Sequence, residues 1–249
     1  SIVARATKAK LYENWTDVSG CLICDPRIVN NPEPIKTITY RELRELAYMG
    51  ATVLHEDAIF PVRAAGIPVN IKNTNQPEDR GTMIVSESAE HCDHIITGIA
   101  GKKGMSVINI EKDKMNSEIG FGKNVLRALE KSNVSFEHMP SGVDTMSVVI
   151  ATEALAGKET AIIDEIKSRV HPDQIYIESN LALIAVVGRG MKSARGTAAI
   201  LFSALADARV NIKMIDQGSS ELNIIVGVEE EDFEVAIKAI YKRFIGINQ

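Results

Sequence analysis

Two cysteines are the first residues whose spacing suggests chemistry, because Cys21 and Cys24 enclose the motif C-L-I-C. A redox or metal site needs both sulfur atoms on one side, usually in a turn or at a helix start. This pair lies in an apolar stretch typical of a β-strand, where residues three apart point to opposite faces. The chain has no second C-x-x-C motif and no histidine pair nearby. We therefore interpret both cysteines as structural and predict no metal site.

Four charged or titratable residues nearer the N-terminus are of types that can take part in catalysis or binding: Asp17, Asp25, Arg27 and His55. Aspartates are common turn residues, and Asp25 precedes a proline. An isolated arginine such as Arg27 is more often a surface ion-pair residue. His55 follows an apolar run, as a structural histidine does. Residue type alone therefore gives none of the four a function.

A short motif occurs twice, as M-N-S-E-I-G at 115–120 and as M-K-S-A-R-G at 191–196. The distance along the chain between these two motifs also separates the A-L pairs that begin at Ala128 and Ala204, and it separates Gly142 from Gly218. It also relates M-S-V-V-I to the later segment L-N-I-I-V. A register shared over this length indicates a duplicated module.

Composition limits the classes of function that the chain can have. Its 249 residues are 45% hydrophobic and 24% charged, which is typical of a globular protein with one large or two to three small domains. The net charge of -5 disfavours a surface for nucleic acid and favours a small-molecule partner. No apolar run approaches the roughly 20 residues that a membrane span needs. With no signal-like N-terminus either, we expect a cytoplasmic protein.

The elements that must position these residues begin with an α/β layer. A helix is expected at 2–9 and a strand around 14–23. Thr39 and Glu42 have the spacing of a capping box, which predicts a helix start, and Gly50 marks a break before a second helix. This second helix ends near Gly66, and the remaining elements of the layer are strands at 67–74 and 82–85.

Each copy of the repeat follows the order strand, turn, helix, strand, strand, helix. In the first copy we expect strands at 106–110, 134–139, 146–150 and 174–178, and helices at 123–133 and 158–170. In the second we expect strands at 181–187, 210–215 and 222–228, and helices at 199–209 and 231–244. Two helices on one face of a four-stranded antiparallel sheet make a ferredoxin-like βαββαβ fold. The second copy lacks its last strand, which a separate strand at 95–100 would supply if the first copy is inserted into the second.

These motifs together resemble a known family. W-T-D-V-S-G, D-P-R-I-V, E-L-A-Y-M-G-A-T-V-L-H and G-I-P-V-N-I-K-N-T are similar to the C-terminal half of the catalytic domain of aspartate kinases, which have the amino-acid kinase fold. Residues 88–249 resemble the paired ACT domains of that family. The resemblance implies part of an amino-acid kinase α/β sandwich followed by two ferredoxin-like ACT domains. The implied boundaries are 1–87 for the kinase part, 103–178 for the inserted first ACT domain, and 88–102 with 179–249 for the second.

The resemblance also implies an activity, the transfer of the γ-phosphoryl group of ATP to the β-carboxylate of L-aspartate. This reaction needs Mg²⁺ and cationic groups on the phosphates. Thr16 and Asp17 match family positions near the nucleotide, and Arg27 matches an arginine on the phosphate side. An arginine at such a place can stabilise spreading negative charge without being deprotonated.

Two features depart from the complete enzyme. The family's N-terminal phosphate motif and aspartate-binding segment would lie before Ser1, so no catalytic residue is assigned here and we predict that this chain alone has no kinase activity. Thr52 stands where the family often has a lysine. Lys72 or Arg80 is the candidate replacement for that cation.

In ACT domains, effectors bind where the turn after the first strand meets a neighbouring module. The first amides of a helix attract a carboxylate, and acidic side chains can hold an ammonium group. Because two acids, Glu137 and Asp144, lie near the loop of the first copy, lysine is the first choice of effector and threonine the second. The candidate residues are Met115, Ser117, Glu118, Gly120, Phe121, Gly122, Phe136, Glu137, Asp144 and Thr145.

The second copy differs in charge at the matching positions. Lys192 and Arg195 take the places of Asn116 and Ile119, and Lys213 occupies the position that matches Glu137. Cations disfavour an ammonium ligand, so we predict that only the first copy binds an effector and that the second serves pairing, with a homodimer formed through the ACT domains. The alternative to a feedback-regulated kinase is a non-catalytic regulatory subunit that binds an amino acid.

Overall fold

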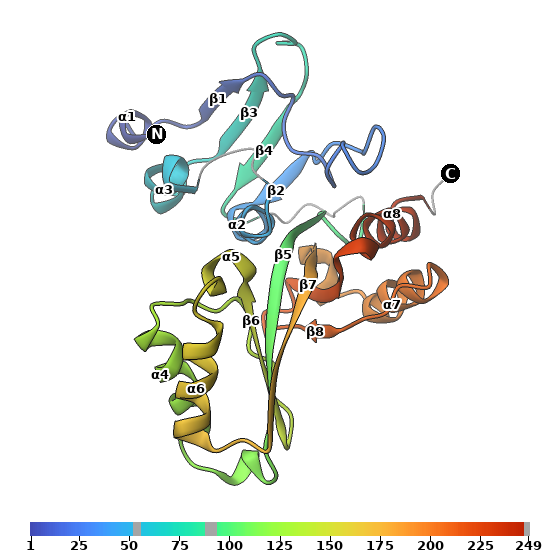
Figure 1. Ribbon diagram of the computed structural model, residues 1–249. Helices are drawn as coiled ribbons and strands as arrows, with labels where there is room; N and C mark the ends of the chain where they lie inside the picture. The colour runs from blue at the N-terminus through green and yellow to red at the C-terminus, as the bar shows by residue number, and fades with distance from the viewer. Residues whose placement is uncertain (52–55, 88–93, 247–249) are drawn as a thin grey trace.

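The computed structural model describes residues 1–51, 56–87 and 94–246. Figure 1 shows a small mixed sheet above a larger antiparallel sheet, with helix α2 (Tyr40–Tyr48) between the two. The mixed α/β class predicted from the sequence is confirmed. None of the helices within the described residues is long and apolar enough to cross a membrane.

The upper layer is a four-stranded sheet with the order β1-β3-β4-β2. Strand β1 pairs with β3 in parallel, β3 with β4 in antiparallel, and β4 with β2 in parallel. The elements of this layer are α1 (Ile2–Ala6), β1 (Tyr12–Thr16), β2 (Thr37–Thr39), α2, α3 (Glu56–Ala64), β3 (Val69–Asn73) and β4 (Thr82–Val85).

Helix α2 begins at the predicted capping box. The Thr39 side chain accepts a hydrogen bond from the Glu42 backbone N–H, and the Glu42 carboxylate accepts one from the Thr39 backbone N–H. Each bond satisfies an amide that the helix itself leaves without an acceptor. The chain leaves the helix through Gly50, whose φ of 98° lies in the left-handed region that favours glycine. Both ends of α2 therefore follow from local residue choice.

The stretch that contains Cys21 and Cys24 is not a strand, and this part of the prediction was wrong. Strand β1 ends at Thr16, and the chain then bends, with one isolated bridge between Leu22 and Pro34. Both cysteines are nevertheless buried and free, in agreement with a structural role. Burial raises the pKa of Cys21 to about 12 and that of Cys24 to about 11.

This burial predicts how the two thiols react. At pH 8 only about a thousandth or less of either thiol would be the reactive thiolate, so iodoacetamide should leave Cys21 and Cys24 unmodified in the folded chain. Peptide mapping by mass spectrometry measures the result, with the guanidinium-unfolded chain as the control in which both react. Equal labelling of Cys21 in the folded and unfolded chain would contradict its place in the core.

The lower sheet has five strands in the order β6-β5-β7-β9-β8. Two of its strands, β5 (Gly98–Glu111) and β7 (Gln174–Val187), are 14 residues long and run through both repeat copies. The separate strands predicted at each place are therefore continuous. The part of β5 that begins at Gly98 pairs with the end of β7, as the proposed insertion requires. A register shift between Lys102 and Met105 then leads into the part that pairs with β6 (Thr145–Ala151).

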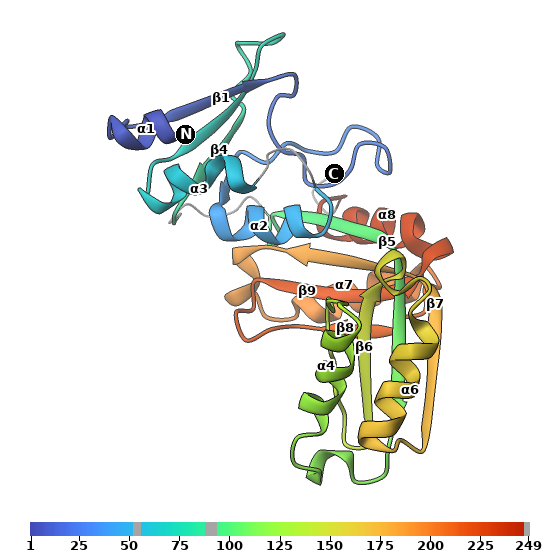
Figure 2. The same ribbon diagram turned by 60° about the vertical axis from the view of Figure 1, so that its left-hand side comes forward.

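Two pairs of helices cover this sheet on different sides, as the two views show (Figures 1 and 2). Helices α4 (Phe121–Lys131) and α6 (Glu159–Val170) belong to the first copy. Helices α7 (Thr197–Asp207) and α8 (Phe233–Phe244) belong to the second. The remaining elements are η1 (Met115–Ser117), α5 (Thr152–Leu155), η2 (Arg189–Lys192), β8 (Met214–Asp216), β9 (Asn223–Glu229) and η3 (Glu230–Asp232).

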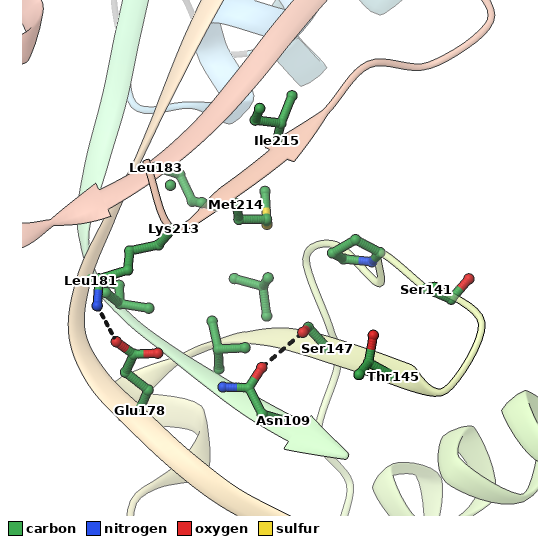
Figure 3. Close-up of a pocket in the computed structure, with 15 residues that line it drawn as sticks. Asn109, Ser141, Thr145, Ser147, Glu178, Leu181, Leu183, Lys213, Met214 and Ile215 are labelled. Atoms are coloured by element: carbon green, nitrogen blue, oxygen red, sulfur yellow. Dashed lines mark hydrogen bonds and ion pairs between the residues drawn. The ribbon is translucent and has the colours of Figure 1, made fainter. Parts of the chain in front are cut away.

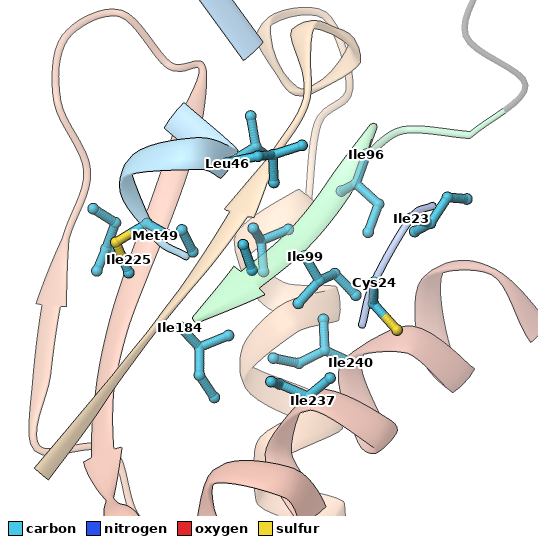
Figure 4. Packing of buried hydrophobic residues seen from close by; sticks show 14 of the residues in the cluster. Ile23, Cys24, Leu46, Met49, Ile96, Ile99, Ile184, Ile225, Ile237 and Ile240 are labelled. Atoms are coloured by element: carbon cyan, nitrogen blue, oxygen red, sulfur yellow. The ribbon is translucent and has the colours of Figure 1, made fainter. Parts of the chain in front are cut away.

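The buried apolar residues of the described ranges form two clusters. One joins the upper layer to the second copy, so that Ile23 and Leu46 share a core with Ile99, Ile184 and Ile237 (Figure 4). The other lies in the first copy and includes residues of helices α4 and α6. The second copy is thus packed into the same core as the upper layer, which is the part that resembles a kinase domain and is called the kinase-like layer below. The helices of the first copy have a core of their own.

Segment 134–139 is not the strand that the sequence predicts. It makes only an isolated bridge from His138 to Val149, supported by a hydrogen bond of 2.8 Å from the Glu137 N–H to the Val149 carbonyl. Pro140 follows directly and has no N–H with which to continue a ladder. The segment instead makes side-chain contacts with two other parts of the chain, which are described below.

Candidate functional site

The two repeated turns have the same construction. Met115 and Met191 are both buried and anchor their turns in the two cores. The Ser117 hydroxyl donates a hydrogen bond of 2.8 Å to the Lys114 carbonyl. In the same way, the Ser193 hydroxyl donates one of 3.2 Å to the Gly190 carbonyl. The shared methionine and serine therefore maintain the fold in both copies.

The glycine that ends each turn has the same backbone conformation. Gly120 has φ 87° and ψ 6°, and Gly196 has φ 85° and ψ 5°. This left-handed conformation strains residues with a side chain. A Cβ atom at either glycine would meet nothing within 4 Å, so backbone conformation and not crowding favours glycine. These residues precede helices α4 and α7, whose first amides have no acceptor within the helix.

Asp144 brings an acidic side chain to the first turn. One of its carboxylate oxygens accepts a hydrogen bond of 2.8 Å from the Lys114 N–H, and its carbonyl accepts one of 2.8 Å from the Lys112 N–H. The Lys112 ammonium forms an ion pair with Glu118. Asp144 itself is exposed. Two carboxylates thus lie around one turn that ends in a helix N-terminus.

The structure separates the predicted effector residues into four groups, and Glu137 alone makes up the last of them. Met115 and Phe121 are 4% and 3% exposed and belong to the core beneath the turn. Phe136 lines a cavity beside helix α4 together with Leu126 and Val134. The residues that remain together at the surface of the turn are Ser117, Glu118, Gly120, Gly122, Asp144 and Thr145.

Glu137 is not brought to this turn. It lies beside Val149, which is about 14 Å along strand β6 from Thr145. Its carboxylate accepts a hydrogen bond from the Tyr48 hydroxyl of helix α2 and lies 2.7 Å from the Lys102 ammonium. Burial opposes ionisation of Glu137, but Lys102 and Tyr48 outweigh it and lower its pKa. Burial and the same carboxylate raise the pKa of Tyr48 to about 12.

The cations of the second copy have different surroundings. Lys213 is 2.6 Å from Glu178 and 2.8 Å from Glu229, and these carboxylates raise its pKa. Lys192 and Arg195 are exposed. The charge difference between the copies is therefore preserved at the surface of the turn, whereas Lys213 already has two acidic partners.

The second turn is also joined to the kinase-like layer, a junction that no motif in the sequence predicts. The Glu42 carboxylate, which is 0% exposed, accepts hydrogen bonds of 2.8 Å from both the backbone N–H and the guanidinium of Arg189. It also accepts bonds from the Thr97 hydroxyl at 2.6 Å and from Thr39 at 2.8 and 2.9 Å. Burial alone would raise the pKa of Glu42, but these donors outweigh burial and lower it.

Two of the predicted nucleotide residues, Thr16 and Asp17, lie at the end of β1 and directly after it. Thr16 donates a hydrogen bond to the Asp17 carboxylate, and its carbonyl accepts one from the Thr74 N–H at 2.8 Å. Next to them, the Lys72 ammonium lies 5.7 Å from the centre of the Trp15 ring. Ligands of α/β sheets commonly bind at the carboxyl ends of parallel strands, and β1 and β3 are such a pair.

Arg27 lies in a separate loop. Its guanidinium forms a two-pronged contact with Asp25, at 2.6 Å from Nη2 and 3.0 Å from Nε, and this pairing lowers the pKa of Asp25. The Arg27 side chain is 87% exposed. Thr52, where the family often has lysine, and His55 lie outside the described residues. Within the described residues, no group of three or more metal-ligating side chains comes together.

A cavity of about 310 Å³ lies between the two repeat copies (Figure 3). Lys213 and Glu178 form an ion pair on one wall, and the Ser147 hydroxyl donates to the Asn109 side chain at 2.8 Å on the other. Apolar residues such as Leu181 also line the cavity. The two copies are therefore not packed tightly against each other on this face of the sheet.

Comparisons with known proteins match both parts of the chain. Residues 1–73 match the amino acid kinase family, and residues 184–244 match the ACT domain. The fold and these matches define the class, which is a segment of an amino acid kinase domain continued by ACT architecture. Within that class the chain matches the aspartokinases over nearly its whole length.

Three relatives illustrate the match. The chain is 43% identical to aspartokinase 3 of Bacillus subtilis over 98% of its own length and 54% of that protein. It is 58% identical to the aspartate kinase of Clostridium acetobutylicum, with a TM-score of 0.93 over 97% of this chain and 56% of the other. E. coli aspartokinase III in complex with lysine and aspartate has the same fold at 24% identity, with a TM-score of 0.78 over 98% of this chain and 54% of that one. The chain thus spans about half the length of these relatives.

Proposed function

We propose that this chain is the regulatory and partial catalytic portion of an aspartate kinase, which transfers a phosphoryl group from ATP, with Mg²⁺, to the β-carboxylate of L-aspartate. The similarity to the Clostridium acetobutylicum aspartate kinase carries this proposal, because it extends through the kinase-like layer and the lower sheet together. Thr16, Asp17 and Arg27 are the proposed nucleotide-side residues. The proposed domains are 1–87, 103–178, and 88–102 with 179–249.

Arg27 offers a test of the catalytic proposal. Its exposed guanidinium is held by Asp25 in one orientation and could meet the phosphates. In the full-length gene product, Arg27→Ala should lower aspartate-dependent ADP release about 100-fold, because a lost positive partner of the transition state costs that order of rate. Arg41→Ala, at another exposed arginine of the same layer, is the control. Unchanged release in Arg27→Ala would remove Arg27 from the nucleotide site.

We propose further that an amino acid effector binds at the first repeated turn. The start of α4 would hold its α-carboxylate, and Asp144 with Glu118 would attract its ammonium groups. The two acids favour lysine over threonine, since lysine carries a second ammonium. The structure of E. coli aspartokinase III is a complex with lysine and aspartate, but its 24% identity to this chain supports a shared fold only. The choice of lysine here therefore rests on charge.

The second copy would serve pairing and attachment. Its turn lacks the acidic partner, carries exposed cations and is fixed to α2 through Arg189. We propose that the chain forms a homodimer through its ACT modules. The alternative, a regulatory chain that binds an amino acid without taking part in catalysis, has the same effector site and differs in the outcome of the ADP-release assay.

A further inference from the structure

Helix α2 meets the lower sheet through a row of polar side chains. Glu42 binds Arg189, Glu45 accepts a hydrogen bond of 2.7 Å from Asn223, and Tyr48 binds Glu137. These three residues of α2 are three positions apart and share one face of the helix. The first two reach the second repeat copy, whose core is continuous with the kinase-like layer. Tyr48 alone of the three reaches the first copy.

The contact at Tyr48 joins three parts of the chain. Glu137 belongs to the first copy, Tyr48 to α2, and Lys102 to the portion of β5 that pairs with the second copy. The Lys102 ammonium also lies 4.4 Å from the centre of the Tyr48 ring, where a cation is attracted to the aromatic face. Each of the three side chains therefore contacts the other two.

The neighbouring residue makes a second link. His138 Nδ1 lies 2.8 Å from the Asp216 carboxylate of β8, which belongs to the second copy. This contact is next to the cavity that separates the copies, whose lining includes Pro140 and Ile215. Segment 134–139 thus holds Val134 and Met139 against the core of the first copy, while Glu137 and His138 contact other parts of the molecule through charged and polar side chains beside an open space. Only a few residues separate it from Asp144 at the first turn.

We propose that Tyr48, Glu137 and Lys102 form a polar joint through which a change at the first turn is passed, along segment 134–145, to helix α2 of the kinase-like layer. This inference rests on the proposed function, because the effector supplies the change. It gives Glu137 a different role from the one that the sequence suggested. Glu137 is a positioning residue between modules and not a ligand of the effector.

Amide hydrogen exchange tests the joint in this chain. Saturating L-lysine should alter exchange in both 134–139 and α2 of the unmodified chain. In Tyr48→Phe, calorimetry should still detect lysine binding, while the change in α2 exchange should fall at least about fivefold, the lower end of usual coupling between sites. Tyr176→Phe, at an exposed tyrosine of the first copy, is the matched control and should respond like the unmodified chain.

An α2 response that persists in Tyr48→Phe would overturn the joint. If neither lysine nor threonine binds the unmodified chain, the proposed effector site fails, and the joint is decided without ligand. Loss of the Tyr48 hydroxyl should then speed exchange of the Glu137 and Val149 amides about three- to tenfold. The Glu137 N–H donates to the Val149 carbonyl and the Val149 N–H to the His138 carbonyl, and these two bonds hold segment 134–139 to β6. Exchange equal to that of Tyr176→Phe would overturn the joint in this arm.

Discussion

Glu42→Ala is expected to lower the free energy of unfolding by about 3–5 kcal/mol, because it leaves Arg189, whose side chain is only 17% exposed, without its buried partner. The carboxylate is 0% exposed and accepts five hydrogen bonds, from Thr39, Thr97 and Arg189. The change removes half of the capping box and separates α2 from the second turn at once. Denaturant unfolding followed by circular dichroism at pH 7 measures the loss.

Glu234→Ala is the matched control for this experiment. Glu234 is 55% exposed and its contact with Lys238 is 3.8 Å long, so its loss should change stability by no more than about 0.5 kcal/mol. A loss below about 1 kcal/mol in Glu42→Ala would show that the junction between the layer and the second copy contributes little.

The same residue predicts a dependence of stability on pH. Because the folded pKa of Glu42 is lowered, its carboxylate stabilises the fold fully above the unfolded pKa of about 4.3. That contribution is lost as the pH falls through the lowered folded pKa. Glu42→Gln has no such titration, so the difference in stability between Glu42→Gln and the unmodified chain should shrink on acidification.

Local features were predicted well from the sequence. The capping box of Thr39 and Glu42 was confirmed because it depends on two residues within one helical turn. The repeated turn was confirmed because its methionine, serine and glycine each act on their own neighbours. Separate strands were expected where β5 and β7 are continuous, because the glycines and lysines near 101–104 suggest a break and form a bulge instead.

Long-range partners were not predicted. Nothing local in the sequence indicates that Glu42 binds Arg189 or that Tyr48 binds Glu137. A glutamate on the face of α2 that also carries Leu43 and Leu46 was one available sign that Glu42 would be buried. Of the candidate effector residues, those at the turn lie together because Asp144 accepts a hydrogen bond from the Lys114 N–H. Glu137 lies apart from them and binds Tyr48 of α2, which is far from it in sequence.

Asp144→Asn is expected to weaken lysine binding at least about tenfold, which corresponds to about 1.4 kcal/mol. Asparagine retains an oxygen that can accept the hydrogen bond from the Lys114 N–H, so the turn should persist while the negative charge is lost. Isothermal titration calorimetry measures the affinity. Asp113→Asn, at a neighbouring aspartate, is the control. The Lys114 N–H donates to the carboxylate of Asp144 and not to that of Asp113.

The most direct test of a single effector site compares the two glycines that share one conformation. Gly120→Ala and Gly196→Ala introduce the same strain at φ 87° and φ 85°, with nothing within 4 Å of either added Cβ. Titration of lysine should give one site per chain, with affinity at least about tenfold weaker in Gly120→Ala and unchanged in Gly196→Ala. Equal loss in both variants, or loss in Gly196→Ala alone, would contradict the assignment of the effector to the first turn.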